Sequence, residues 1–165
     1  PLCAVGLDAE LWRWTTTHVS TPDEMRRYVE TALQEQREGK SLPFATIDKL
    51  SSRVVGCTRF GNIDIVNRHV EIGWTWIGRV NTEAKYLMLS YAFEKLGCIR
   101  VSLKTDALNE KSRRAILRIG AKEEGTLRNH IITSSGRIRD TVYFSIIDRE
   151  WEQVKRDLEA KLFNR

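Results

Sequence analysis

The chain has 165 residues, of which 41% are hydrophobic and 30% are charged, a composition typical of one globular domain with a substantial core. It excludes intrinsic disorder as the main state, and no apolar run is long enough to span a bilayer. The formal net charge of +5 is spread without blocks of like charge and is compatible with a polyanionic ligand. The three cysteines and three histidines lack metal-ligand spacing, which favours a reduced, metal-free, cytoplasmic protein.

The first half of the chain predicts one helix followed by three strands. Residues 21–24 supply an N-cap, a proline at the first helical position and early acids, and apolar residues then recur at helical spacing until Gly39. Short β-rich runs separated by polar turn residues follow at residues 44–48, 54–60 and 69–77. We expect these runs to form an antiparallel meander.

The second half alternates helices and strands. A helix over residues 81–96, ended by Gly97, has an inward face that we expect to comprise Ala84, Leu87, Met88, Tyr91, Ala92 and Leu96. The further elements predicted are a strand at 99–105, a helix at 109–119, two strands at 121–133 and 137–147 joined by a hairpin turn at 134–136, and a helix from Asp148. Residues 69–105 form a βαβ unit, so its two strands are expected to be parallel with a right-handed crossover in a mixed sheet.

The strand at residues 69–77 contains two residues that are unusual for such a position. Gly73 interrupts a continuous β run, which indicates a bulge or a close approach by another group. Strand alternation places Glu71 and Gly73 on one face with His69 and Thr75, and the other face then holds Val70, Ile72, Trp74 and Trp76. Glu71 is a candidate base, and the alternative is a structural ion pair with an arginine.

Two helix starts are candidate anion sites. The connection from Trp76 to Thr82 leads into the positive end of a helix, although its single glycine, Gly78, is also compatible with a plain connection. Ser112 lies on the inward face of the next helix, where its hydroxyl either binds a developing anion or bonds the amides of its own helix. The arginines of that helix either hold phosphates or form a solvated face, and they are Arg113, Arg114 and Arg118.

Five segments together resemble the GNAT superfamily of N-acetyltransferases, and the ribosomal-protein alanine N-acetyltransferase type is the nearest branch. The segments are EIGWTW at 71–76, VNTEAKYL at 80–87, KTDALNEKSRRAI at 104–116, GAKEEG at 120–125 and RDTVY at 139–143. The resemblance implies an α+β fold in which helices flank a mixed central sheet containing the βαβ unit at residues 69–105. The resemblance runs from about Thr58 to Trp151, and because no linker divides the chain we expect a single domain over residues 1–165.

The resemblance implies acetyl-CoA as cosubstrate and assigns site residues. The pantetheine arm is expected in the splay between the two parallel strands, and the pyrophosphate at the helix start near Asn81. The expected catalytic residues are Glu71 as general base and Ser112 at the departing sulfur. The cofactor-binding residues are expected to be Trp74, Trp76, Ile77, Asn81, Thr82, Asn109 and Arg114, with no metal.

The sequence departs from the family at two places. Members carry a loop of several residues before the Asn-Thr-Glu-Ala helix, whereas here Ile77 and Asn81 are joined almost directly, and the family's N-terminal strand is not found after Pro1. We interpret both as residues absent from the given chain, which predicts a Cα–Cα step well above about 3.8 Å between Ile77 and Asn81. The alternative is a true deletion of the loop, with normal Cα–Cα spacing and impaired cofactor binding.

The function expected is acetyl transfer from acetyl-CoA to a primary amine, either a protein N-terminus or a small molecule, by direct attack in a ternary complex. A homodimer is left open, and no membrane partner is expected. The alternative is a non-catalytic GNAT-like binding or assembly module with impaired CoA binding. A basic nucleic-acid-binding domain is less favoured because the arginines are scattered and no nucleic-acid motif is found.

Overall fold

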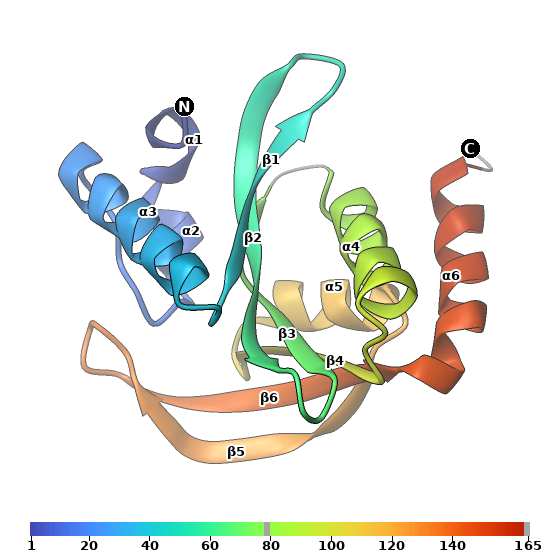
Figure 1. The fold of residues 1–165 in the computed structure, drawn as a ribbon. Helices are drawn as coiled ribbons and strands as arrows, with labels where there is room; N and C mark the ends of the chain where they lie inside the picture. The colour runs from blue at the N-terminus through green and yellow to red at the C-terminus, as the bar shows by residue number, and fades with distance from the viewer. Residues whose placement is uncertain (78–79, 164–165) are drawn as a thin grey trace.

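In the part of the chain that the structure describes, six strands form one mixed sheet in the order β1-β2-β3-β4-β6-β5 (Figure 1). The structure is a computed structural model, and it describes residues 1–77 and 80–163. The strands are β1 (Leu42–Asp48), β2 (Arg53–Asp64), β3 (His69–Ile77), β4 (Arg100–Asp106), β5 (Lys122–Ile132) and β6 (Ile138–Ile147). β3 and β4 are parallel, and every other neighbouring pair is antiparallel. The predicted meander, the parallel strands of the βαβ unit and the hairpin are therefore confirmed.

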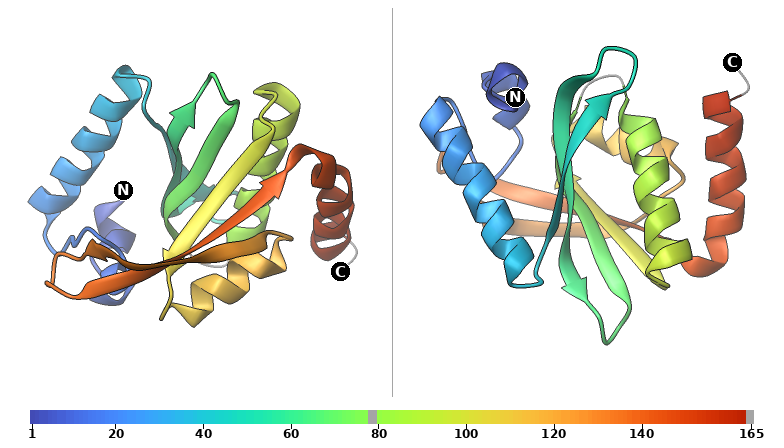
Figure 2. Two further views of the ribbon diagram at one scale, coloured as in Figure 1. Left: turned by 90° about the horizontal axis from the view of Figure 1, so that it is seen from below. Right: turned by 45° about the horizontal axis from the view of Figure 1, so that its top comes forward.

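Helices cover both faces of this sheet (Figure 2). One face carries α1 (Cys3–Gly6), α2 (Ala9–Trp12) and α3 (Pro22–Arg37), and the other carries α4 (Asn81–Ser90), α5 (Glu110–Arg118) and α6 (Asp148–Phe163). The cap predicted for α3 forms, because Thr21 and Glu24 make a reciprocal capping box. The sequence did not predict α1 and α2, since a four-residue helix shows no apolar periodicity. Among the described helices, none has the length and apolarity needed to cross a membrane.

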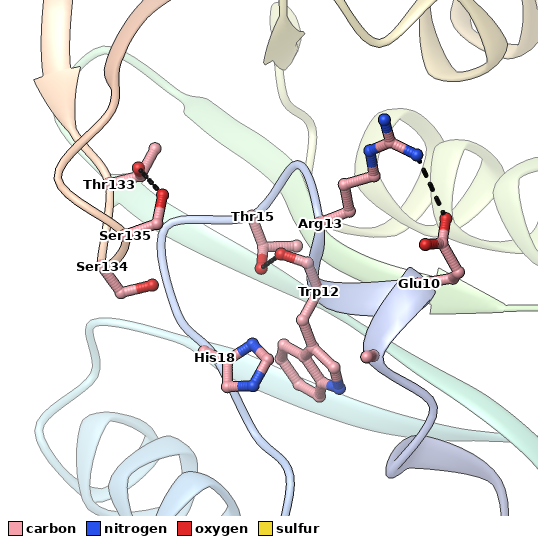
Figure 3. Close-up of a pocket in the computed structure, with 9 residues that line it drawn as sticks. Glu10, Trp12, Arg13, Thr15, His18, Thr133, Ser134 and Ser135 are labelled. Carbon is pink, nitrogen blue, oxygen red and sulfur yellow. Dashed lines mark hydrogen bonds and ion pairs between the residues drawn. The ribbon is translucent and has the colours of Figure 1, made fainter.

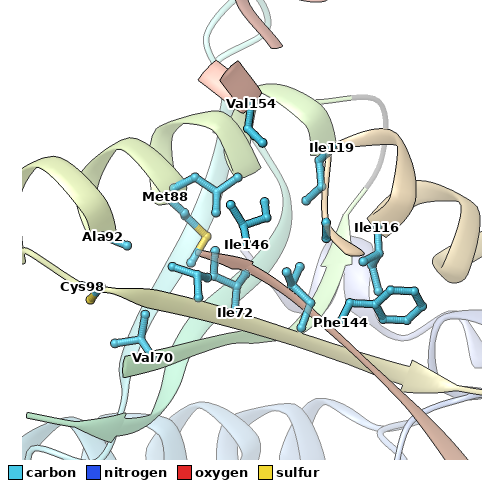
Figure 4. Close-up of a cluster of buried hydrophobic side chains, with 14 of the residues drawn as sticks. Val70, Ile72, Met88, Ala92, Cys98, Ile116, Ile119, Phe144, Ile146 and Val154 are labelled. Atoms are coloured by element: carbon cyan, nitrogen blue, oxygen red, sulfur yellow. The ribbon is translucent and has the colours of Figure 1, made fainter. Parts of the chain in front are cut away.

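The main core lies between the sheet and helices α4, α5 and α6 (Figure 4). Alternate residues of the central strands point into it, and Val101, Phe144 and Ile146 are completely buried there. A smaller cluster lies on the other face under α1 to α3, and it consists of Trp12, Val19, Met25, Cys57 and Trp76. Each face of the sheet therefore has its own apolar cluster.

The inward face predicted for α4 is only partly correct, because Met88 and Ala92 are buried as expected but three other residues are not. Leu87 is 60% exposed, and Tyr91 and Leu96 are also exposed, whereas Lys85 is buried together with Met88 and Leu89. One reason is that apolar residues occur on several sides of this helix, so periodicity alone does not select the buried side. The other is a π-helical turn, η1 (Tyr91–Lys95), in which the Leu96 amide donates to the Tyr91 carbonyl and the extra residue rotates the end of the helix.

The strand predicted at residues 54–60 is longer than expected. β2 continues through Gly61 to Asp64, and only the short connection before His69 is a turn. Asn62 adopts a positive φ of 46° where the register with β3 shifts, so the polar residues that suggest a turn instead form an irregular strand end. This extension brings Asn62 beside β3.

Candidate functional site

Strands β3 and β4 diverge after a short paired segment. They pair from His69 opposite Arg100 to Glu71 opposite Ser102. Beyond this point β3 follows β2 as far as Ile77, and β4 follows β6 as far as Asp106. The diverging strands therefore each have an edge whose backbone N–H and C=O groups can pair with an extended ligand.

A β-bulge lies on β3 where this splay opens. Three residues of β2, Cys57 to Arg59, lie opposite four of β3, Gly73 to Trp76, and Trp74 has a φ of 49°. The bulge predicted from Gly73 is confirmed, with its strained residue one position later. A positive φ at a residue with a large side chain costs about 1–3 kcal/mol. Such strain is concentrated at functional sites.

The bulge also corrects the predicted faces of β3. We expected Trp74 and Trp76 on the face of Ile72, and Thr75 on the face of Glu71. Instead, Trp76 packs with Trp12 under the N-terminal helices, and Thr75 faces α4. The reason is geometric, because one extra residue reverses the alternation of every side chain that follows it.

Glu71 is buried at the last paired position before the splay. Its Oε2 accepts a hydrogen bond from Asn62 Nδ2 at 3.0 Å and lies 3.1 Å from Lys104 Nζ. A Cβ added to Gly73 would lie 3.1 Å from Glu71 Oε1, so the group that approaches Gly73 is this carboxylate. The ion pair considered as the alternative therefore forms, with a lysine in place of an arginine. Among the residues described, Oε1 has no hydrogen-bond donor, and it lies beside the bulge.

Asn109 and Ser112 lie at the start of α5. The Asn109 side chain accepts a hydrogen bond from the Ser112 amide at 3.0 Å and so caps the helix. Ser112 is half-buried, and its Oγ makes no hydrogen bond within residues 1–77 and 80–163. The back-bonding alternative considered for this hydroxyl is therefore not seen, because Asn109 performs the capping.

Asn81 and Thr82 begin α4 and lie close to the end of α5. Asn81 Oδ1 is buried and has no partner in the described part of the chain. Thr82 Oγ1 accepts from Arg118 Nη2 at 3.4 Å, whereas Arg114 is exposed and pairs with Glu110 at 3.6 Å. Arg118 is thus the arginine that reaches this helix start, and cofactor binding by Arg114 stays a prediction.

Trp74 and Trp76 have different surroundings. The Trp76 indole is buried against Trp12, with ring centroids 5.7 Å apart, so any contact with a ligand in the splay is left to its backbone. Trp74 is partly exposed, and the Arg59 guanidinium lies 5.1 Å from its ring centroid. Ile77 ends β3 opposite Gly56. The chain break predicted between Ile77 and Asn81 concerns residues 78–79, which lie outside the described residues.

Trp74 lines a pocket of about 310 Å³ between β2, β3 and α3. Arg59 is held there between the rings of Tyr28 and Trp74 and donates to Glu35 at 2.8 Å. Burial raises the pKa of Tyr28 to about 12, so its hydroxyl remains protonated. The pocket is lined by Thr17, His18, Val19, Glu24, Arg27, Tyr28, Thr31, Glu35, Arg59 and Trp74. Tyr28 and Glu35 could not be predicted here from the sequence because they belong to α3, which is distant along the chain from β2 and β3.

A second pocket of about 340 Å³ lies between α2 and the β5–β6 turn (Figure 3). Its lining includes Trp12, Ser134 and Ser135, and His18 lines both pockets. Trp12 and the hairpin turn thus line this pocket, whereas Arg59 lines the pocket beside Trp74. Trp14 lies nearby, where Arg139 donates to its carbonyl oxygen at 3.2 Å.

Comparison with known proteins supports the predicted fold and family. Residues 1–122 match the family model of the acetyltransferase (GNAT) domain. "Putative ribosomal N-acetyltransferase YdaF" of Bacillus subtilis (strain 168) is 40% identical over 106 residues, which is 61% of this chain and 57% of that protein. The match therefore spans little more than half of that relative.

Solved structures give the same result. A GCN5-related N-acetyltransferase from Brucella melitensis has a TM-score of 0.85 and 32% identity, and the match covers 95% of this chain and 72% of that chain. A spermidine N-acetyltransferase from Vibrio cholerae, solved with CoA and spermine, has a TM-score of 0.74 and covers 90% of this chain and 89% of its own. At 17% identity it is similar in fold alone.

Proposed function

This chain belongs to the GNAT family of acetyltransferases, and on that premise we propose that it transfers the acetyl group of acetyl-CoA to a primary amine. The observation that carries the proposal is the splay between β3 and β4, which opens beside the bulge at Trp74. The unpaired edge of β3 suits the amide groups of a pantetheine arm, which can add to the sheet as an extended strand does.

The donor would be held at both ends of this splay. At the bulge, a backbone N–H in the segment 74–77 would polarise the acetyl carbonyl, and one preorganised donor of this kind supplies about 3 kcal/mol. At the start of α4, unpaired helix amides, the Asn81 side chain and Arg118 would face the pyrophosphate. Asn109 would bond the pantetheine arm in addition to capping α5.

The residues around the bulge suit the proton transfers that the reaction needs. A protein α-amine titrates near 7.7–8.0 and a lysine amine near 10.4, so the attacking amine must lose a proton. We assign this proton to Glu71, directly or through a water molecule, because Oε1 lies next to the bulge while Oε2 is held by Asn62 and Lys104. The Ser112 hydroxyl would hydrogen-bond or protonate the departing sulfur.

The acceptor amine would approach through the pocket beside Trp74. Its lining has two carboxylates, Glu24 and Glu35, and two guanidinium groups, Arg27 and Arg59, so the formal charges balance. A polyamine would favour an acidic lining. The balanced charges therefore support a protein N-terminus as acceptor, because its amine lies close to a polar peptide carbonyl.

Thiol release from acetyl-CoA, measured across a panel of amines, tests this proposal. The panel would comprise N-terminal peptides, the same peptides with a blocked N-terminus, and spermidine. We expect release with free N-terminal peptides and none with blocked ones, together with a higher melting temperature in millimolar acetyl-CoA. A chain that neither binds CoA in calorimetry nor releases thiol would instead be a non-catalytic binding module.

A further inference from the structure

α4 carries a lysine that points into the protein, toward the sheet. The side chain of Lys85 is buried, and its Nζ donates to Thr75 Oγ1 at 2.7 Å and to Thr58 Oγ1 at 3.0 Å. In the described part of the chain no carboxylate pairs with it, and the ionisable group that acts on it is the Cys57 thiol on β2. Burying a lysine without a counter-ion costs free energy unless its surroundings compensate for the burial.

The two threonines connect this amine to the bulge. Thr58 lies on β2 and Thr75 on β3, their Oγ1 atoms are 2.8 Å apart, and both lie within reach of the Gly73 carbonyl oxygen, at 3.4 and 3.2 Å. Each hydroxyl has one proton to donate. One of these protons joins the two threonines and the other binds the Gly73 oxygen, so both hydroxyl oxygens accept from Lys85.

The lysine fits this network as a neutral amine. A neutral amine has two N–H groups, and the two threonines use both, whereas the third proton of an ammonium group finds no acceptor among the residues described. Burial lowers the pKa of Lys85 to about 7, which agrees with this proton count. Every N–H and O–H group of the network therefore has an acceptor when Lys85 is uncharged.

We propose that Lys85 is a positioning residue that fixes the direction of the Trp74 amide at the bulge. The peptide plane supplies the connection, because the Gly73 C=O and the Trp74 N–H belong to one planar trans peptide and point in opposite directions. The hydrogen bond that holds the Gly73 oxygen toward the threonine pair thus aims the Trp74 N–H to the other side. The strained φ of Trp74 needs such an external restraint to persist.

This inference rests on the proposed function, in which a bulge amide polarises the acetyl carbonyl. A misdirected amide would lose contact with charge that develops in the transition state, while binding of the rest of acetyl-CoA would be retained. The expected effect of breaking the network is therefore on kcat and not on KM. If Lys85 only filled space, its replacement would change neither kcat nor KM.

Steady-state kinetics of Lys85→Met test the inference, with Lys95→Met as the matched control because Lys95 is an exposed lysine farther along the same helical segment. We expect a fall in kcat of at least tenfold for Lys85→Met, with a change of less than threefold in KM for acetyl-CoA. Lys95→Met should match the wild type. Thr75→Val should reproduce the loss, and Thr75→Ser, which keeps the hydroxyl, should restore most of the activity.

A second measurement needs no substrate. In ¹⁵N-labelled full-length chain, the Trp74 amide resonance should shift in Lys85→Met and Thr75→Val and stay in place in Lys95→Met. Wild-type kcat together with an unchanged Trp74 resonance in a folded Lys85→Met would overturn the inference. If the wild type releases no thiol and binds no CoA, the proposed function fails, and the amide resonance still decides whether Lys85 sets the bulge.

Discussion

The two faces of the sheet use the same strands for different purposes. The face under α4, α5 and α6 is a continuous apolar core, in which Val101, Phe144 and Ile146 alternate regularly out of β4 and β6. The face toward α1, α2 and α3 combines a small apolar cluster with buried or half-buried charged groups, including Arg59, Glu71 and Lys104. The first face provides stability, and the second provides chemical groups. Lys85 departs from this division, since its buried amine lies on the apolar side together with the hydroxyls of Thr58 and Thr75.

Phe144→Ala should give the largest loss of stability. The ring is completely buried in the main core, and its removal leaves a cavity that costs about 3–5 kcal/mol. Urea unfolding followed by fluorescence measures the change. Tyr143→Phe, one residue away on the other face, is the control and should change stability by less than about 1 kcal/mol. Equal losses of stability in the two variants would contradict the conclusion that the face under α4, α5 and α6 provides the stability.

Lys85→Met should remove a pH dependence of stability. Because burial lowers the pKa of Lys85 from 10.5 to about 7, the unfolded chain binds more protons than the folded one between these values, so stability rises with pH across this window. From pH 6 to pH 9 the wild type should gain about 3 kcal/mol more than Lys85→Met. Urea unfolding at the two pH values measures the difference. Parallel pH profiles would show that the lysine is charged or exposed in solution.

Glu71→Gln should reduce acetyl transfer by about a hundredfold at pH 7, the lower end of the range for general-base catalysis. The deficit should shrink toward pH 9, where more of a protein α-amine is already neutral. Thiol release at the two pH values measures the effect, with the Asn62–Glu71 contact kept by the glutamine oxygen. A deficit independent of pH would point to a role for Glu71 in shaping the strand.

Gly73→Ala should give the smallest change in stability and a clear loss of activity. The added Cβ would lie 3.1 Å from Glu71 Oε1, so the carboxylate must move by a few tenths of an ångström. We expect less than about 1 kcal/mol in urea unfolding and a several-fold lower kcat. Full activity in this variant would mean that the position of Oε1 is not important for the reaction.

The sequence predicts features that repeat along the chain and misses those that depend on a single residue. The strands β4 and β6 were predicted because the alternation of apolar and polar residues continues along them over many positions. The faces of Thr75 and Trp76 were wrong because one extra residue at Trp74 reverses the pattern, and the letters on either side fit both alternatives. The inward position of Lys85 was missed because hydrophobic periodicity assigns a lysine to solvent.

The site was predictable only where its residues share one segment. Glu71 and Gly73 lie two positions apart, so strand alternation placed them on one face, whereas it placed Trp74 on the opposite one. The partners of Arg59 could not be found in this way, since Tyr28 and Glu35 come from α3 and meet it only after the sheet and helix pack. The sequence alone could not show which arginine of α5 reaches the start of α4. Arg114 and Arg118 lie on the same polar helix, and only the packing of α5 beside α4 distinguishes them.

Because of the bulge at Trp74, β3 cannot gain or lose a single residue without further changes. Deleting Trp74 would restore a regular ladder, but it would also exchange the faces of Thr75 and Trp76. The indole that completes the cluster under α1 to α3 would then meet Lys85, and a threonine hydroxyl would enter an apolar cluster. A gain or loss of one residue here therefore requires simultaneous changes on both sides of the sheet, whereas point substitutions can be accepted one at a time.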